Sequence, residues 1–126
     1  MFYVDECLGR GVGEALQKAG AQVRIFGEAI PRGARDADWL AAIGKENWIC
    51  LTKDKHIRRR LAERNALLAA RVRAFVLTSG NLTGAEMAEI FASNVRRIER
   101  FARRTKPPFI AKITRNGVIE EYPDIT

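Results

Sequence analysis

The sequence contains few of the residues that mark secreted, zinc-binding or membrane-spanning proteins. Its two cysteines, Cys7 and Cys50, have neither the close spacing of a zinc site nor the density of a disulfide scaffold, so both are expected to be buried, reduced thiols. No stretch approaches the roughly 20 apolar residues that span a bilayer. The acidic pair Asp5 and Glu6 interrupts the N-terminus where a signal peptide requires an apolar run. These absences predict a cytoplasmic protein without a membrane segment.

The composition is that of one folded domain with an excess of positive charge. The chain has 126 residues, of which 47% are hydrophobic and 29% are charged. This length is enough to form one hydrophobic core and too short for two. We therefore expect one domain over residues 1–126. Its 22 lysines and arginines outnumber its 15 acidic residues, which gives a net charge of +7. This charge favours a polyanionic partner such as nucleic acid or an acidic protein, although it could serve solubility alone.

Short apolar runs alternate with amphipathic segments along most of the chain. Strands are expected at 2–4, 22–26, 48–52 and 72–78, and helices at 8–19, 36–47 and 56–70. Thr83 and Glu86 have the spacing of a capping box that opens one long helix, which Pro107 and Pro108 end. Asn116-Gly117 then predicts a hairpin over about 109–122. The order predicts an α/β fold in which helices cover both faces of a mainly parallel sheet, with the C-terminal hairpin as an appendage.

Three aspartates occupy comparable places in this pattern. Asp5 ends the first strand, Asp36 opens a helix, and Asp54 follows the 48–52 strand. Ligands of open parallel sheets gather at the carboxyl ends of the strands, so we expect these carboxylates within roughly 4 to 8 Å of one another. Such a group suits Mg²⁺ or Mn²⁺, with Glu6 and Asp38 as auxiliary ligands or bases. Taken singly, Asp36, Asp38 and Asp54 could instead cap helices or lie in solvent, but Asp5 has no capping role.

Several segments resemble a known family. The motifs are FYVDECLG, the helix start D-x-D-W-L and the junction ICLTKDKHIRRR, together with VRAFVLTSGNLTG, RRIERFARR and PPFIAKITRNG. They are similar to the short PIN-like domains, whose relatives include the VapC-type toxins of bacterial toxin–antitoxin pairs, and they span nearly the whole chain. The resemblance implies a three-layer α/β/α sandwich and a Mg²⁺-dependent endoribonuclease with Asp5, Asp36 and Asp54 as catalytic metal ligands.

The resemblance also implies partners and exposes one departure from the family pattern. It implies an RNA substrate, a cognate antitoxin protein and a homodimer, since toxins of this group often pair. Larger PIN domains carry a further acidic residue on a helix before the position of Asp36. The chain is too short there for that helix, which leaves Asp38 as a substitute or a site with fewer ligands.

Basic residues gather in two places. Phosphate contacts are expected from the residues that flank Asp54, namely Lys53, Lys55, Arg58, Arg59 and Arg60. A second basic face lies opposite the apolar stripe of the long helix and comprises Arg96, Arg97, Arg100, Arg103 and Arg104. It could bind RNA or an acidic antitoxin tail, or simply lie in solvent. Ser79 and Asn81 are secondary candidates at a strand end, where they could bind a phosphate or only terminate the strand.

Two other functions remain open at this point. Asp5-Glu6, Asp54, Thr78 and Lys106-Pro107 follow the order of the conserved groups of a response-regulator receiver domain. A receiver needs its lysine directly at a strand end, however, whereas Lys106 follows a helix, and Asp36 would have no role. The third hypothesis is a PIN-like module that binds nucleic acid or protein without cutting.

Overall fold

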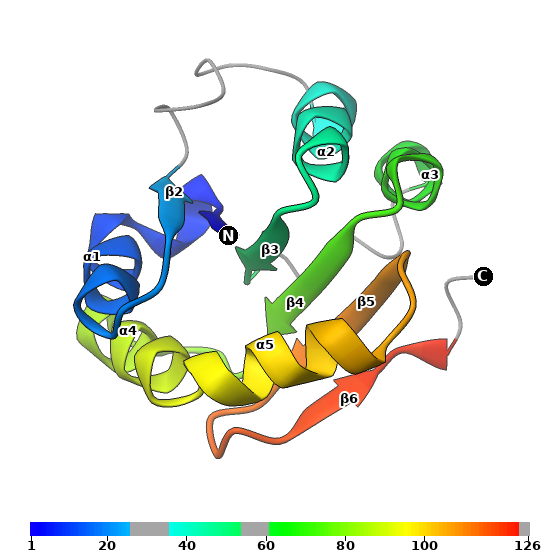
Figure 1. Ribbon diagram of the computed structural model, residues 1–126. Helices are drawn as coiled ribbons and strands as arrows, with labels where there is room; N and C mark the ends of the chain where they lie inside the picture. Colours follow the sequence, from blue (N-terminus) through cyan, green and yellow to red (C-terminus); the bar gives the residue numbers. More distant parts are fainter. Residues whose placement is uncertain (26–35, 54–60, 124–126) are drawn as a thin grey trace.

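The computed structural model describes residues 1–25, 36–53 and 61–123, and within these ranges all side chains except those of Glu6, Ile25, 36–40 and 61–63. Twelve elements follow along the chain (Figure 1). They are β1 (Phe2–Val4), the 3-10 helix η1 (Glu6–Leu8), α1 (Arg10–Lys18), β2 (Val23–Ile25), α2 (Asp36–Lys45), β3 (Ile49–Thr52), α3 (Leu61–Ala70), β4 (Arg73–Leu77), α4 (Gly84–Ser93), α5 (Val95–Arg104), β5 (Phe109–Ile113) and β6 (Ile119–Glu121).

The strands form one six-stranded sheet in the order β2-β1-β3-β4-β5-β6. Every neighbouring pair is parallel except β5 and β6, which are antiparallel. The chain passes from β1 to β2 on one side and then returns across β1 to β3 on the other. The direction of winding therefore reverses between β1 and β3, which is where open α/β sheets form their ligand crevice.

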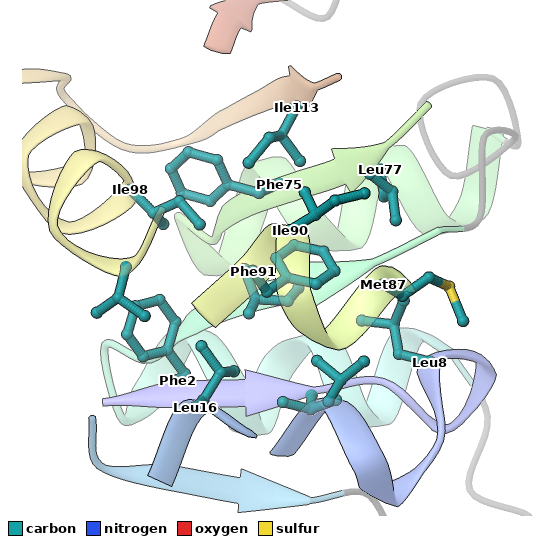
Figure 2. Close-up of a cluster of buried hydrophobic side chains, with 14 of the residues drawn as sticks. Phe2, Leu8, Leu16, Phe75, Leu77, Met87, Ile90, Phe91, Ile98 and Ile113 are labelled. Carbon is teal, nitrogen blue, oxygen red and sulfur yellow. The ribbon is translucent and has the colours of Figure 1, made fainter. Parts of the chain in front are cut away.

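Helices cover both faces of the sheet, as the α/β prediction required. Phe2 and Val4 of β1 point into a core shared with α1, α4 and α5, whereas the intervening Tyr3 points into a second core with α2 and α3. Figure 2 shows part of the first core, where Phe91 and Ile98 of the helices approach side chains of the sheet. The three-layer α/β/α sandwich is thus confirmed, and no helix of the described residues is long and apolar enough to cross a membrane.

The single long helix expected after Thr83 is in fact two helices, and this prediction was wrong. The capping box is present, because the Thr83 hydroxyl accepts from the Glu86 backbone N–H at 3.1 Å and the Glu86 carboxylate accepts from the Thr83 N–H at 3.0 Å. The break occurs at Asn94, whose backbone leaves helical geometry at φ −116° and ψ 12°. Its side-chain amide donates to the Ile90 carbonyl at 2.7 Å. Asparagine competes with the helical backbone in this way, so α4 and α5 take different directions.

The C-terminal hairpin is part of the sheet and not an appendage. β5 pairs in parallel with the whole of β4, from Arg73 opposite Phe109 to Leu77 opposite Ile113. Phe109 and Ile110 are fully buried on opposite faces, so β5 is a central strand. The expected Asn116-Gly117 turn connects β5 to β6, and Gly117 has a φ of +81°, which glycine adopts without strain. The chain segment read as a hairpin therefore completes the core.

Candidate active site

Asp5 lies at the carboxyl end of β1, at the point where the winding of the sheet reverses. β1 and β3 pair with Val4 opposite Leu51, so the next residues, Asp5 and Thr52, lie level with each other. The Asp5 backbone N–H donates to the Leu51 carbonyl at 3.0 Å and extends the ladder by one step. The half-buried carboxylate of Asp5 is thereby fixed beside the end of β3.

One oxygen of the Asp5 carboxylate is anchored and the other is not. Oδ2 accepts hydrogen bonds from the Thr52 hydroxyl at 2.7 Å and from the Cys7 thiol at 3.2 Å. Thr52 is fully buried, so its hydroxyl is held in one place. No donor among the described residues bonds Oδ1. A hard cation requires an oriented anionic oxygen with a vacant lone pair, and Oδ1 of Asp5 fits that requirement.

Cys7 belongs to this cluster, which corrects the expectation that both cysteines are buried. Cys7 is an exposed residue and Cys50 is buried, and both are free thiols. Although the residue as a whole is exposed, its sulfur is partly shielded from water, and this desolvation together with the negative charge of Asp5 raises the pKa of the Cys7 thiol to about 11. The thiol is therefore protonated near neutral pH and can donate its hydrogen to Asp5.

The remaining predicted ligands are placed only in part. α2 begins at Asp36 and returns the chain from the carboxyl end of β2 to the amino end of β3. The start of α2 therefore lies toward the carboxyl edge of the sheet, which is the edge that holds Asp5. The side chains of Asp36, Asp38 and Glu6 are not described. Asp54 lies outside the described residues, together with Lys55, Arg58, Arg59 and Arg60. Convergence of the carboxylates therefore stays a prediction, and the described side chains include no group of three or more potential metal ligands.

Of the basic and polar candidates at the strand ends, three are described. Lys53 directly follows β3 and is exposed beside Asp5, and its backbone N–H contacts the Cys7 sulfur at 3.5 Å. The Ser79 hydroxyl accepts from the Arg115 backbone N–H at 3.2 Å, which ties the end of β4 to the hairpin turn. Asn81 is exposed with a left-handed φ of +58°. The contact with Arg115 gives Ser79 a structural role, and a role in ligand binding stays a prediction for both Ser79 and Asn81.

Thr52 and Cys7 are the two site residues that sequence reasoning did not select. Thr52 ends the predicted 48–52 strand, and its contact with Asp5 depends on a strand pairing across 47 residues. Cys7 follows Asp5 by two positions, and the turn of η1 brings its thiol back to the carboxylate. The spacing D-x-C after a strand was the available signal.

The structure argues against a receiver domain. Lys106 lies between α5 and β5, at the amino end of β5. Asp5 lies at the carboxyl end of the parallel strands, which is the opposite edge of the sheet. Lys106 therefore does not occupy the place from which a receiver lysine contacts its phosphoryl group.

The chain has a three-layer α/β fold, and Asp5 lies where the winding of the parallel sheet reverses. These features place it in the broad class of α/β proteins that bind ligands at the carboxyl edge of the sheet. Residues 1–79 match the model of the family described as PIN-like domain, so the chain belongs to the PIN-like domain family. The matched range contains Asp5, Asp36 and Asp54. The resemblance noted from the motifs is thus confirmed.

One relative matches over most of the chain. It carries the name "Putative ribonuclease VapC45", comes from Mycobacterium tuberculosis, and is 27% identical over 123 residues. The match covers 94% of this chain and 88% of the relative. No solved structure matches the chain.

Proposed function

We propose that this protein is a metal-dependent endoribonuclease and acts as the toxin of a bacterial toxin–antitoxin pair. The observation that carries the proposal is the Asp5 carboxylate, which Thr52 and Cys7 orient through Oδ2 while Oδ1 accepts no hydrogen bond from the described residues. Membership of the PIN-like family and the match to a relative named as a ribonuclease support it. The +7 charge suits a polyanionic substrate.

Within this proposal, Asp5, Asp36 and Asp54 hold Mg²⁺ or Mn²⁺, with Glu6 and Asp38 as auxiliary groups. A bound cation of this kind polarises a phosphodiester and lowers the pKa of a bound water. Thr52 keeps Asp5 in one orientation, so the carboxylate needs no rearrangement to act as a ligand. Lys53, Lys55, Arg58, Arg59 and Arg60 would position the RNA phosphates beside this edge.

The proposed partners are an RNA substrate, a cognate antitoxin and a second copy of the chain. The relative's name supports the first two, because VapC-type toxins are paired with antitoxins. We propose that the protein acts in the cytoplasm, because an RNA substrate is found there.

The experiment that tests the proposal is Asp5→Asn in an RNA-cleavage assay with and without Mg²⁺ or Mn²⁺. The amide keeps the shape of the side chain and can still accept from Thr52, but it lacks the charge that a hard cation requires. We expect cleavage to be abolished while the melting temperature in metal-free buffer is unchanged or higher, since like charges at the site are reduced.

Glu99→Gln is the matched control. Glu99 lines a cavity with Met1 and Asn47, which precede β1 and β3 at the amino edge of the sheet. Its neutralisation should leave cleavage at the wild-type rate. Wild-type cleavage by purified Asp5→Asn protein would refute the proposed role of Asp5, and metal-dependent RNA binding without any cleavage would instead favour the non-catalytic module.

A further inference from the structure

A groove lies between α5 and the β5–β6 hairpin, away from the candidate active site. It has a volume of about 200 Å³ and is lined by Arg97, Arg100, Phe101, Arg104, Gly117 and Ile119. In the sheet, β3, β4 and β5 separate β1, which carries Asp5, from β6, which carries Ile119. A ligand in this groove would therefore leave the Asp5 edge uncovered.

No acidic side chain of the described residues neutralises the positive charge in the groove. Arg97, Arg100 and Arg104 have the helical spacing of three and four residues and share one face of α5. All three are exposed, and none forms a hydrogen bond or ion pair with any described residue. Two other surface cations do have partners, since Arg115 pairs with Glu86 at 2.9 Å and Lys112 pairs with Glu120 at 3.4 Å. The groove therefore presents three guanidinium groups to an external anion.

The groove also contains apolar surface. Phe101 and Ile119 are half-buried side chains in its lining. Val118, next to Ile119, has a relative exposure of 46%. Only Val118 and Met1 are exposed among the large hydrophobic residues of the described part of the chain. Phe101 and Ile119 thus place apolar surface beside the three arginines, and Val118 follows Gly117 in the hairpin without lining the groove.

The wall of the groove is held by close packing. A Cβ added to Gly117 would lie 2.6 Å from the Asn94 side-chain oxygen and 3.1 Å from a guanidinium nitrogen of Arg97. The hairpin turn therefore lies directly against the beginning of α5, and only glycine fits there. A ligand meets a preformed groove and does not have to order it.

We propose that this groove binds an acidic segment of a partner protein, in which carboxylates alternate with apolar side chains. The carboxylates would pair with Arg97, Arg100 and Arg104, and an apolar side chain would cover Phe101 and Ile119. Arginine combined with aromatic and aliphatic surface is typical of protein interfaces, whereas phosphate backbones require only an open basic face. A second copy of a chain with a charge of +7 lacks the required complementarity. This inference does not depend on the proposed ribonuclease activity.

The test is fluorescence anisotropy of a labelled peptide that contains glutamates and leucines, with the full chain in metal-free buffer. We expect Arg100→Glu to weaken binding by at least about tenfold, and Ile119→Ser to weaken it less. Arg96→Glu is the matched control, because Arg96 is exposed on the same helix but does not line the groove. It should change the affinity by less than about twofold, since an exposed charge outside the contact contributes little. A peptide with glutamine in place of glutamate should not bind.

Several outcomes would overturn the inference. One is absence of peptide binding, and another is equal weakening by Arg100→Glu and Arg96→Glu, which would indicate general charge attraction. Loss of affinity for a 2′-O-methyl RNA in Arg100→Glu, with peptide affinity unchanged, would assign the groove to nucleic acid. Conversion of a dimer to a monomer by Arg100→Glu, measured by sedimentation, would assign it to a second copy. The assay measures no cleavage, so failure of the ribonuclease proposal would not affect its result.

Discussion

The contact between Thr52 and Asp5 is the most informative detail at the scale of single residues. A buried hydroxyl needs a hydrogen-bond acceptor, and the 2.7 Å bond to Asp5 provides one. The same bond restricts the carboxylate to one orientation. Residues that orient a metal ligand commonly affect metal affinity almost as strongly as the ligand itself. Thr52 is therefore expected to act as a positioning residue in the proposed metal site.

Thr52→Val should separate this role from a structural one. Valine has nearly the same shape but cannot donate to Asp5, so the carboxylate keeps only the longer hydrogen bond from Cys7. We expect Mn²⁺ affinity, measured by calorimetry, to fall by about tenfold to a hundredfold. The free energy of unfolding should fall by only about 1 kcal/mol.

Thr78→Val is the control for that substitution. Thr78 directly follows β4, and its hydroxyl contacts the Ile113 carbonyl at 3.5 Å and no carboxylate. A comparable loss of Mn²⁺ affinity in both variants would show that Thr52 has no special role. Serine at position 52 should restore most of the affinity, because it supplies the hydroxyl again.

At the scale of elements, the capping box predicted from the sequence is present at the start of α4. Thr83 and Glu86 satisfy each other's backbone N–H groups, as the capping box requires. Thr83→Ala should lower the free energy of unfolding by about 1 kcal/mol, because one N–H at the helix start loses its acceptor. Urea denaturation followed by circular dichroism measures this change. Unaltered stability would show that the cap is unimportant in this chain.

The same element should depend on pH through Glu86. Hydrogen bonds from Thr83, with a smaller contribution from the charge of Arg115, lower the pKa of Glu86. Because the pKa of Glu86 is lower in the folded state than in the unfolded state, the ionised carboxylate stabilises the fold at pH values above its unfolded-state pKa. This stabilisation is lost as the pH falls through the folded-state pKa. The stability difference between wild type and Glu86→Gln should therefore shrink on acidification. A difference that grows toward low pH would contradict this account.

The break at Asn94 has a consequence for the surface. α4 packs mainly against α1, while Val95, Ile98 and Ala102 of α5 pack over the sheet. The helix that begins after Asn94 carries the arginines that line the groove together with the hairpin.

At the scale of the whole molecule, the excess of positive charge should govern association with RNA. Each phosphate contact with single-stranded nucleic acid contributes about −0.7 to the slope of log affinity against log salt. If Lys53, Lys55, Arg58, Arg59 and Arg60 all contact phosphates, the slope should be about −3.5. Filter binding of RNA to the Asp5→Asn protein across a salt series measures this slope.

Arg58→Ala tests the assignment of those contacts. It should reduce the magnitude of the slope by about 0.7 and weaken RNA binding for all sequences alike. The rate of cleavage of bound RNA should be nearly unchanged, since the residue would position phosphates without contacting the reacting atoms. Affinity indifferent to salt would contradict the electrostatic account altogether.

Much of the fold could be predicted because its signals are local. The alternation of apolar runs and amphipathic segments indicated the α/β order, Thr83 and Glu86 indicated the start of α4, and Asn116-Gly117 indicated the hairpin turn. Each of these features depends on residues within a few positions of one another, so propensity and spacing determine them. The motifs likewise sufficed to recognise the PIN-like family.

Only the tertiary structure decided the features that join distant parts of the chain. The register of β1 and β3 sets Thr52 beside Asp5, the pairing of β4 with β5 makes the hairpin part of the core, and the bend at Asn94 brings Arg97 to Gly117. None of these contacts follows from local periodicity, because each is selected by the free energy of packing the whole sheet and its helices together. Asp5 could thus be selected from the sequence, whereas its anchor and the basic groove could not.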